Sequence, residues 1–67
     1  MVVITLNGEA RTLADQPTIG ELVAQLDLKP ERVAIERNGA IQPRPTWADT
    51  RLADGDVLEI VHFVGGG

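Results

Sequence analysis

Residues 18–26 read TIGELVAQL, and this stretch predicts an amphipathic α-helix. Thr18 at the N-cap and Glu21 three residues later form a capping-box pattern, in which each side chain bonds a backbone N–H of the other residue. Four apolar residues follow at positions i, i+3, i+4 and i+7 and form one stripe: Ile19, Leu22, Val23 and Leu26. We expect Leu28-Lys29-Pro30 to close the helix and the stripe to pack against a sheet.

The residues before the helix predict a β-hairpin. Val2 to Leu6 reads as a short strand, and Glu9 to Leu13 can return beside it. Asn7-Gly8 between them is a strong turn signal, because both central residues of a type I′ turn need positive φ.

The residues after the helix predict three more strands. Val33 to Arg37 is one, and after a second turn signal at Asn38-Gly39 a brief strand runs from Ala40 to Gln42. Pro43 to Pro45 interrupts regular pairing, and Val57 to Val64 is the longest strand candidate. A right-handed crossover through the helix would set the first and last strands side by side and parallel. The predicted fold is α+β: a β-grasp (ubiquitin-like) roll, with a mixed sheet wrapped on one main helix.

Composition limits the chain to one small domain and narrows its partners. Its 67 residues include no Cys, 43% are hydrophobic, and the formal net charge is −4. The sequence shows neither a signal peptide nor a membrane span, and the lack of Cys agrees with a reducing compartment, so we expect a cytoplasmic location. One Trp, one Phe and no Tyr in an acidic chain argue against nucleic-acid binding and are compatible with a basic protein partner.

Side chains for conventional catalysis are missing. The chain has neither Ser nor Cys, which excludes a Ser or Cys triad, and its one His, His62, lies within the last predicted strand. The glycines fit neither a phosphate loop nor a dinucleotide-binding fingerprint. A tight turn explains Asp54 and Asp56 better than a calcium loop does. We assign the scattered acidic residues, together with Arg37 and Arg44, to the solvated surface.

The last predicted strand carries apolar residues on both faces. Leu58 and Ile60 should face the helix, which leaves Val61 and Phe63 on the open face of the sheet. An exposed apolar patch marks a protein-docking surface, although a central strand buried on both faces would show the same pattern. We expect Val61 and Phe63 to bind partners, and Trp47 to close one end of the core rather than to anchor a partner.

The sequence ends in Gly65-Gly66-Gly67, and we expect residues 1–64 to form the domain and residues 65–67 a flexible tail. A segment without side chains is the slimmest that a polypeptide can form, and three extended residues span roughly 10 Å. Such a tail can enter a narrow channel and present the Gly67 carboxylate to the active site of another protein. A frayed terminus is the alternative.

Several short segments follow one another along the chain in an order that is typical of one family. They are the Asn7-Gly8 turn, Thr18 to Val23, Val33 to Gly39, Ile41 to Arg44, Trp47, Thr50, Leu52 to Val61 with its Asp-Gly-Asp turn, and Phe63 to Gly67 with its terminal glycines. Over the whole chain these segments resemble the ThiS family of sulfur carriers in thiamin biosynthesis. That family belongs to the β-grasp superfamily, with ubiquitin and the small subunit of molybdopterin synthase.

The resemblance implies that the chemistry takes place at the C-terminus. A ThiF-type adenylating enzyme would use ATP and Mg to adenylate the Gly67 carboxylate. A sulfur donor such as a cysteine desulfurase would then supply the sulfur of a thiocarboxylate, and thiazole synthase (ThiG) would use it to form thiazole. Gly65 and Gly66 would serve as the flexible guide. The chain would then be a protein co-substrate and not an enzyme, and it would bind no cofactor or metal itself.

Three alternatives stay open at this point. A related β-grasp carrier could supply sulfur for molybdopterin, cysteine or tRNA thiolation. A ubiquitin-like modifier would be joined to lysines through its terminus. A non-catalytic β-grasp binding module would not need its tail.

Overall fold

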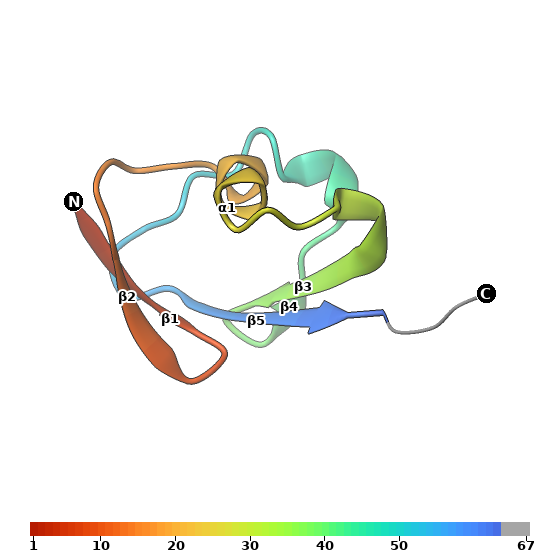
Figure 1. The fold of residues 1–67 in the computed structure, drawn as a ribbon. Coiled ribbons are helices and arrows are strands. Elements are labelled where there is room, and N and C mark those ends of the chain that lie inside the picture. Colours follow the sequence, from red (N-terminus) through yellow and green to blue (C-terminus); the bar gives the residue numbers. More distant parts are fainter. Residues whose placement is uncertain (64–67) are drawn as a thin grey trace.

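The computed structural model describes residues 1–63, in which five strands form one mixed sheet with an α-helix across one face (Figure 1). The sheet order is β2-β1-β5-β3-β4, with β1 and β5 parallel and the other pairs antiparallel. This arrangement confirms the predicted mixed sheet on one main helix. The elements are β1 Val2–Leu6, β2 Glu9–Leu13, α1 Ile19–Gln25, η1 Pro30–Arg32, β3 Val33–Arg37, β4 Ala40–Ile41, η2 Arg44–Thr46 and β5 Val57–His62, where η marks a 3-10 helix.

Both Asn-Gly pairs form the turns that the sequence predicts. Asn7 and Gly8 have φ values of 49° and 83°, and Asn38 and Gly39 have values of 54° and 87°. Positive φ at both central residues matches the right-handed twist of the flanking strands, so each hairpin closes after two residues. Strands β1, β2 and β3 cover the residues expected for them.

Helix α1 begins with the predicted capping box and ends earlier than expected. The Glu21 N–H donates to Thr18 Oγ1 at 3.1 Å, and the Thr18 N–H donates to Glu21 Oε1 at 2.8 Å. The helix stops at Gln25 because Asp27 takes a left-handed conformation, with φ 59°. The Leu28 N–H then donates to the Val23 carbonyl at 3.1 Å, as in a Schellman motif. The expected end at Leu28-Lys29-Pro30 was therefore wrong, because Pro30 begins η1 instead.

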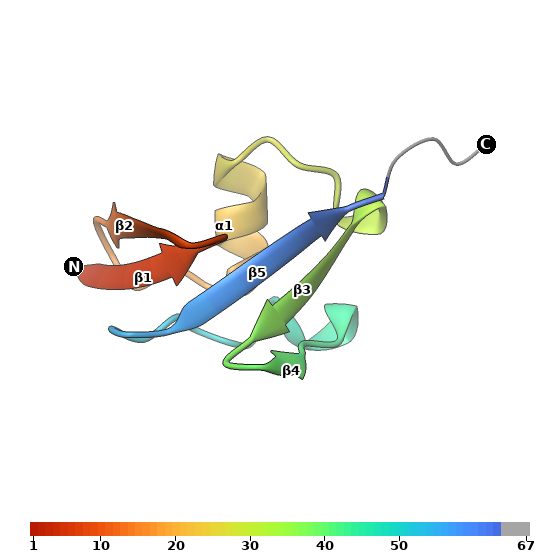
Figure 2. The same cartoon turned by 90° about the horizontal axis from the view of Figure 1, so that it is seen from below.

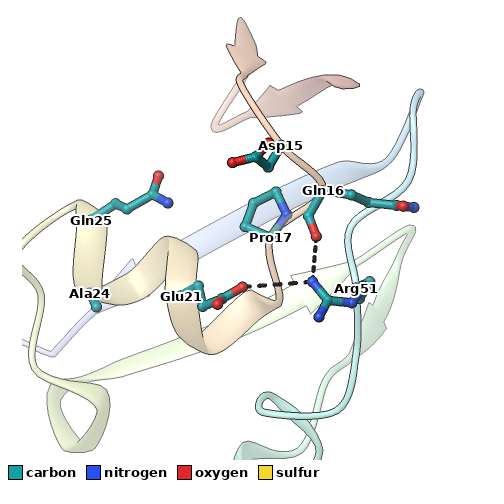
Figure 3. Close-up of a pocket in the computed structure, with 7 residues that line it drawn as sticks. All are labelled: Asp15, Gln16, Pro17, Glu21, Ala24, Gln25 and Arg51. Carbon is teal, nitrogen blue, oxygen red and sulfur yellow. Dashed lines mark hydrogen bonds and ion pairs between the residues drawn. The ribbon is translucent and has the colours of Figure 1, made fainter. Parts of the chain in front are cut away.

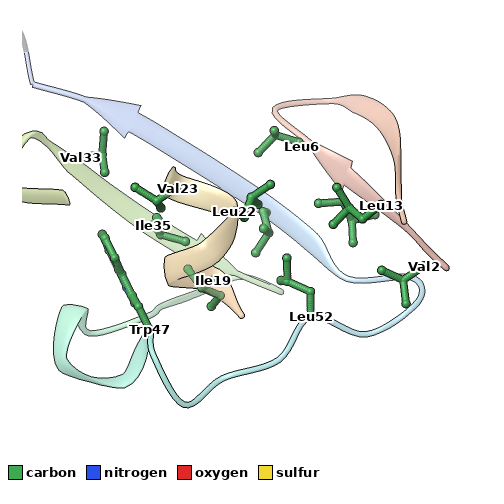
Figure 4. Close-up of a cluster of buried hydrophobic side chains, with 12 residues drawn as sticks. Val2, Leu6, Leu13, Ile19, Leu22, Val23, Val33, Ile35, Trp47 and Leu52 are labelled. Carbon is green, nitrogen blue, oxygen red and sulfur yellow. The ribbon is translucent and has the colours of Figure 1, made fainter. Parts of the chain in front are cut away.

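The hydrophobic core lies between α1 and the sheet (Figure 4). Ile19, Leu22 and Val23 of the helix are fully buried, and Leu26 packs against the edge of the core, so the predicted stripe is confirmed. Trp47 is 4% exposed and closes one end of the core, as expected, while its indole Nε1–H donates to the Gln42 carbonyl at 2.9 Å. The polar end of this side chain is therefore satisfied on burial.

The other face of the sheet carries no helix among the described residues. Figure 2 views the sheet from this side, with β5 between β1 and β3 and with α1 behind them. We call this surface the open face. Strand β5 ends at His62, two residues before the expected Val64, although the Phe63 N–H still donates to the Arg32 carbonyl at 2.8 Å.

Val64 and the glycines Gly65, Gly66 and Gly67 lie outside the described residues, and so does the expected boundary between the domain and its tail. Within residues 1–63, no helix is long and apolar enough to cross a membrane.

Candidate functional site

The candidate site is the part of the open face around the end of β5, next to the last described residue, Phe63. Val61 is 55% exposed and Phe63 is 49% exposed, whereas Leu58 is buried and Ile60 packs against the core. The alternation expected from the sequence therefore holds along β5. The structure places Val61 and Phe63 on an accessible surface, and Gly65, Gly66 and Gly67 lie outside the described residues.

The Asn7 side chain fixes β5 to the first hairpin. The Ile60 N–H donates to Asn7 Oδ1 at 2.8 Å, and Asn7 Nδ2 donates to the Ile60 carbonyl at 3.3 Å. The Asn7 backbone N–H also donates to the Leu58 carbonyl at 2.9 Å. The side-chain amide of Asn7 thus bonds β5 as a backbone amide would, and it continues the pairing with β5 beyond the end of β1 at Leu6.

Asn38 does the same for the start of β5 from the second hairpin. Its backbone N–H donates to the Val57 carbonyl at 2.7 Å, and its Oδ1 accepts from the Val57 N–H at 2.9 Å. Its Nδ2 donates to Asp56 Oδ1 at 3.1 Å. Both asparagines therefore serve β5 as well as their turns, which the Asn-Gly pattern alone does not reveal.

Asp56 lies at the centre of the network before β5 and is only 6% exposed. Its carboxylate accepts from Arg37 Nε at 3.0 Å and from the Ala53 N–H at 2.8 Å, in addition to Asn38. Burial raises the pKa of Asp56, but the hydrogen bonds from Ala53, Asn38 and Arg37 and the charge of Arg37 outweigh it and hold the pKa below its ordinary value. The assignment of Asp56 and Arg37 to the solvated surface was wrong, because this ion pair is largely shielded from water.

The preceding Asp54-Gly55 turn attaches the same segment to β1. Asp54 Oδ1 accepts from the Val3 N–H at 2.7 Å, and the Gly55 N–H donates to the Val3 carbonyl at 2.8 Å. Gly55 has φ 90°, which explains the glycine at this position. The expected tight turn is confirmed, and its aspartates serve hydrogen bonds within the fold.

Arg44 is exposed, yet it has a structural role that the sequence did not indicate. Its Nε donates to the Pro30 carbonyl and its Nη2 to the Val33 carbonyl, both at 2.9 Å. Its guanidinium also lies 5.3 Å from the centroid of the Trp47 ring. Arg44 thereby holds η2 against the start of β3 and covers the indole.

A groove of about 470 Å³ lies beside α1, away from the open face (Figure 3). Arg51 is the cation among the described residues that line it. Its Nη1 donates to the Gln16 carbonyl at 2.7 Å and lies 3.9 Å from Glu21 Oε1. Since that guanidinium is engaged by the protein and a carboxylate lies beside it, the groove is poorly suited to an anionic ligand such as a nucleotide.

The described residues around the end of β5 offer a docking surface. Among residues 1–63, no three His, Cys, Asp or Glu side chains come together in a group that could hold a metal ion. The features that converge on β5 fix its position and leave Val61 and Phe63 accessible.

Comparison with known proteins places this geometry in a family. The model of the ThiS family matches residues 4–67. The sulfur carrier protein ThiS of Bacillus subtilis is 42% identical over 65 residues, which cover 96% of this chain and 98% of that protein. A thiazole synthase of Paramagnetospirillum magneticum is 41% identical over 64 residues, and the chain spans 20% of that protein's length.

A solved structure agrees with the sequence relatives. The crystal structure of the thiamine biosynthesis protein ThiS from Geobacter metallireducens superposes with a TM-score of 0.83 at 33% identity. The match covers 98% of this chain and 100% of that one, which confirms the β-grasp fold. The chain belongs to the ThiS family.

Proposed function

We propose that this protein is a sulfur carrier for thiamin biosynthesis that works through the carboxylate of Gly67. The observation that carries the proposal is similarity over the full length of a ThiS sulfur carrier, within a family match that extends to residue 67. A carrier of this kind is a co-substrate, and the catalytic groups, the ATP and the Mg belong to its partner enzymes.

The proposed chemistry converts a poor electrophile into a sulfur donor in three steps. An adenylating enzyme of the ThiF type transfers AMP from ATP to the Gly67 carboxylate and releases pyrophosphate. The terminal sulfur of a persulfide, held by a donor such as a cysteine desulfurase, attacks the acyl carbon and AMP leaves. A thiol then cleaves the resulting acyl disulfide and releases the thiocarboxylate.

The described part of the chain contributes position and docking to this chemistry. Strand β5 is paired on both sides and clamped by the Asn7 and Asn38 side chains, so it holds the chain before residues 64–67 in a defined place. Val61 and Phe63 offer the apolar contact surface next to it. Gly65 and Gly66 would pass through the narrow entrance of a partner's active site, where a side chain would not fit.

We infer that thiazole synthase (ThiG) accepts the sulfur. Support comes from thiazole synthases that contain a segment similar to this chain, because a segment joined to an enzyme in some proteins can act on that enzyme as a separate chain in others. We expect these reactions to occur in the cytoplasm, where ATP and thiols are available. Acceptors for molybdopterin, cysteine or tRNA thiolation are the competing destinations.

Intact mass spectrometry tests the proposal. The protein is incubated with its adenylating enzyme, MgATP, a cysteine desulfurase with cysteine, and a thiol. We expect a gain equal to the mass difference between sulfur and oxygen, located in the C-terminal peptide. A variant without Gly67 is the matched control and should show no gain. An unchanged mass for the intact protein, in a mixture that thiolates a known ThiS, would refute the proposal.

The ubiquitin-like modifier alternative predicts a different product. In that case incubation with ATP and cell extract would yield adducts on lysines that survive reducing gels. Binding to thiazole synthase, compared with binding to the enzymes of the other sulfur acceptors, distinguishes the remaining destinations.

A further inference from the structure

Two carboxylates face each other at the centre of the open face. Glu36 of β3 and Glu59 of β5 are directly paired in the antiparallel register. Directly opposed like charges in neighbouring strands are destabilising, and opposed residues of a hydrogen-bonded pair lie about 5.5 Å apart at their Cα atoms. The sequence did not single out this pair, because only the strand register brings the two residues together.

Neither carboxylate is neutralised within the described part of the chain. The ion pairs there join Arg37 to Asp56 and Arg51 to Glu21. The strands contain two arginines, and both lie on the helix side of the sheet, since Arg11 is opposite Ile4 and Arg37 is opposite Leu58.

Apolar side chains border the pair on the open face. Val57 and Val61 lie two residues before and after Glu59 on the same face of β5, and both are exposed. Ile41 lies beside Glu36 on β4 and is also exposed. The surface therefore combines two neighbouring negative charges with exposed apolar side chains around them. It is complementary to a partner surface on which a positively charged side chain is surrounded by apolar ones.

We propose that Glu36 and Glu59 together receive a side-chain cation, an arginine or lysine, from the surface of thiazole synthase when that enzyme docks on the open face. The proposal rests on the proposed function and adds the chemistry by which the partner is recognised. Arginine suits the site best, because its planar guanidinium is weakly hydrated and can donate to both carboxylates at once. Binding would also remove the repulsion that the free protein carries between the two glutamates.

The location of the pair fits a carrier whose C-terminus must reach an active site. Phe63 continues the same face of the chain, and Gly67 is the fourth residue after it. Four extended residues span about 14 Å at most. A partner docked by Val61, Phe63 and the glutamates would therefore have its reaction centre within that distance of Phe63.

Paired variants separate this role from a general effect of charge. The first is Glu36→Gln with Glu59→Gln, which keeps the side-chain shapes and removes both charges. The matched control is Glu9→Gln with Glu31→Gln, which removes two exposed charges from β2 and η1. Thermal unfolding and the Kd for purified thiazole synthase are measured for both variants and the unchanged protein, at low and high salt.

We expect the first variant to unfold at a higher temperature than the unchanged protein and to bind more weakly, with a Kd raised on the order of tenfold at low salt. High salt should reduce this difference. The control should change the Kd by less than about threefold, since distant charges act only through the overall field. Equal losses in the two variants, or no loss in the first, would overturn the proposal. So would failure of the unchanged protein to bind thiazole synthase.

The binding result is independent of the sulfur-transfer result. Binding that depends on the glutamates without a mass gain would refute the carrier chemistry and support the docking surface. A mass gain, together with binding that is unchanged when the glutamates are replaced, would support the carrier chemistry and refute the docking proposal. Sedimentation of the free protein tests whether a second copy of the chain occupies the open face instead. A dimer that the first variant abolishes would show this and would overturn the proposal.

Discussion

Replacing Asp56 with asparagine should destabilise the fold far more than its place in a surface turn suggests. Asp56→Asn keeps the shape of the side chain but removes the charge that faces Arg37 at 3.0 Å. One of its carboxylate oxygens becomes an NH₂ group, which cannot accept. If this group replaces Oδ2, it faces the Ala53 N–H and Arg37 Nε, which donate to Oδ2. If it replaces Oδ1, it faces Asn38 Nδ2. At least one donor loses its acceptor in either orientation.

The magnitude follows from those contacts. Loss of a hydrogen bond to a charged group costs about 1.5–3 kcal/mol, and the part-exposed Arg37 lowers the ionic share through solvent screening. We expect the free energy of unfolding to fall by about 1.5–2.5 kcal/mol at pH 7. A domain of this size has roughly 3–10 kcal/mol in total, so the loss is a large fraction of its stability.

Urea unfolding followed by fluorescence measures the loss, because Trp47 is buried and is the chain's one Trp. Asp49→Asn is the control, since Asp49 is an exposed acid, and it should change the free energy by less than about 0.5 kcal/mol. The pH dependence gives a second check. The folded pKa of Asp56 is lowered, so its stabilisation is complete above its unfolded pKa of about 4 and is lost as the pH falls through the lower folded value. The difference in stability between the unchanged protein and Asp56→Asn should therefore begin to shrink as the pH falls below about 4, and should be lost only below the lowered folded pKa. Equal stability of the two at pH 7 would refute the reasoning.

Three further changes test other parts of the structure. Asn7→Gly keeps positive φ accessible but removes both side-chain bonds to Ile60, so urea unfolding should show a loss of about 1–2 kcal/mol, and full stability would show that the clamp is unimportant. Thr18→Ala removes the cap acceptor of Glu21 and should cost about 1 kcal/mol in the same assay, whereas Thr18→Ser should restore most of it. Val61→Thr should leave the unfolding midpoint nearly unchanged, because the side chain is exposed and Thr is also favoured in strands, but should weaken binding to thiazole synthase in calorimetry. Unaltered binding would exclude Val61 from the docking surface.

The sequence predicted the features that depend on neighbouring residues. The Asn-Gly turns, the capping box and the alternation of β5 each arise from local geometry, and each is confirmed. The end of α1 was wrong because its left-handed residue is Asp27, and a glycine is the usual signal for that position.

Features that depend on distant residues could not be predicted in this way. Asp56 looked like one of several surface acids until the fold brought Arg37 and Asn38 to it, from 19 and 18 residues away. The open-face pair of Glu36 and Glu59 likewise required the exact pairing of β3 with β5. The alternation of residues along β5 predicted that Val61 is exposed. The negative charge beside it could be recognised only from the register that pairs Glu36 with Glu59.

The central position of β5 has a mechanical consequence for a protein that is handled by its end. The C-terminus joins the described domain through Phe63 and the end of β5, so a pull on the terminus acts on β5. The hydrogen bonds to β3 run across the axis of β5, and a pull along the strand loads them together in shear instead of opening them one at a time. The asparagine clamps to Val57 and Ile60 add resistance from both hairpins. Tension on the end of the chain should therefore move the whole domain toward the partner before any strand is peeled away.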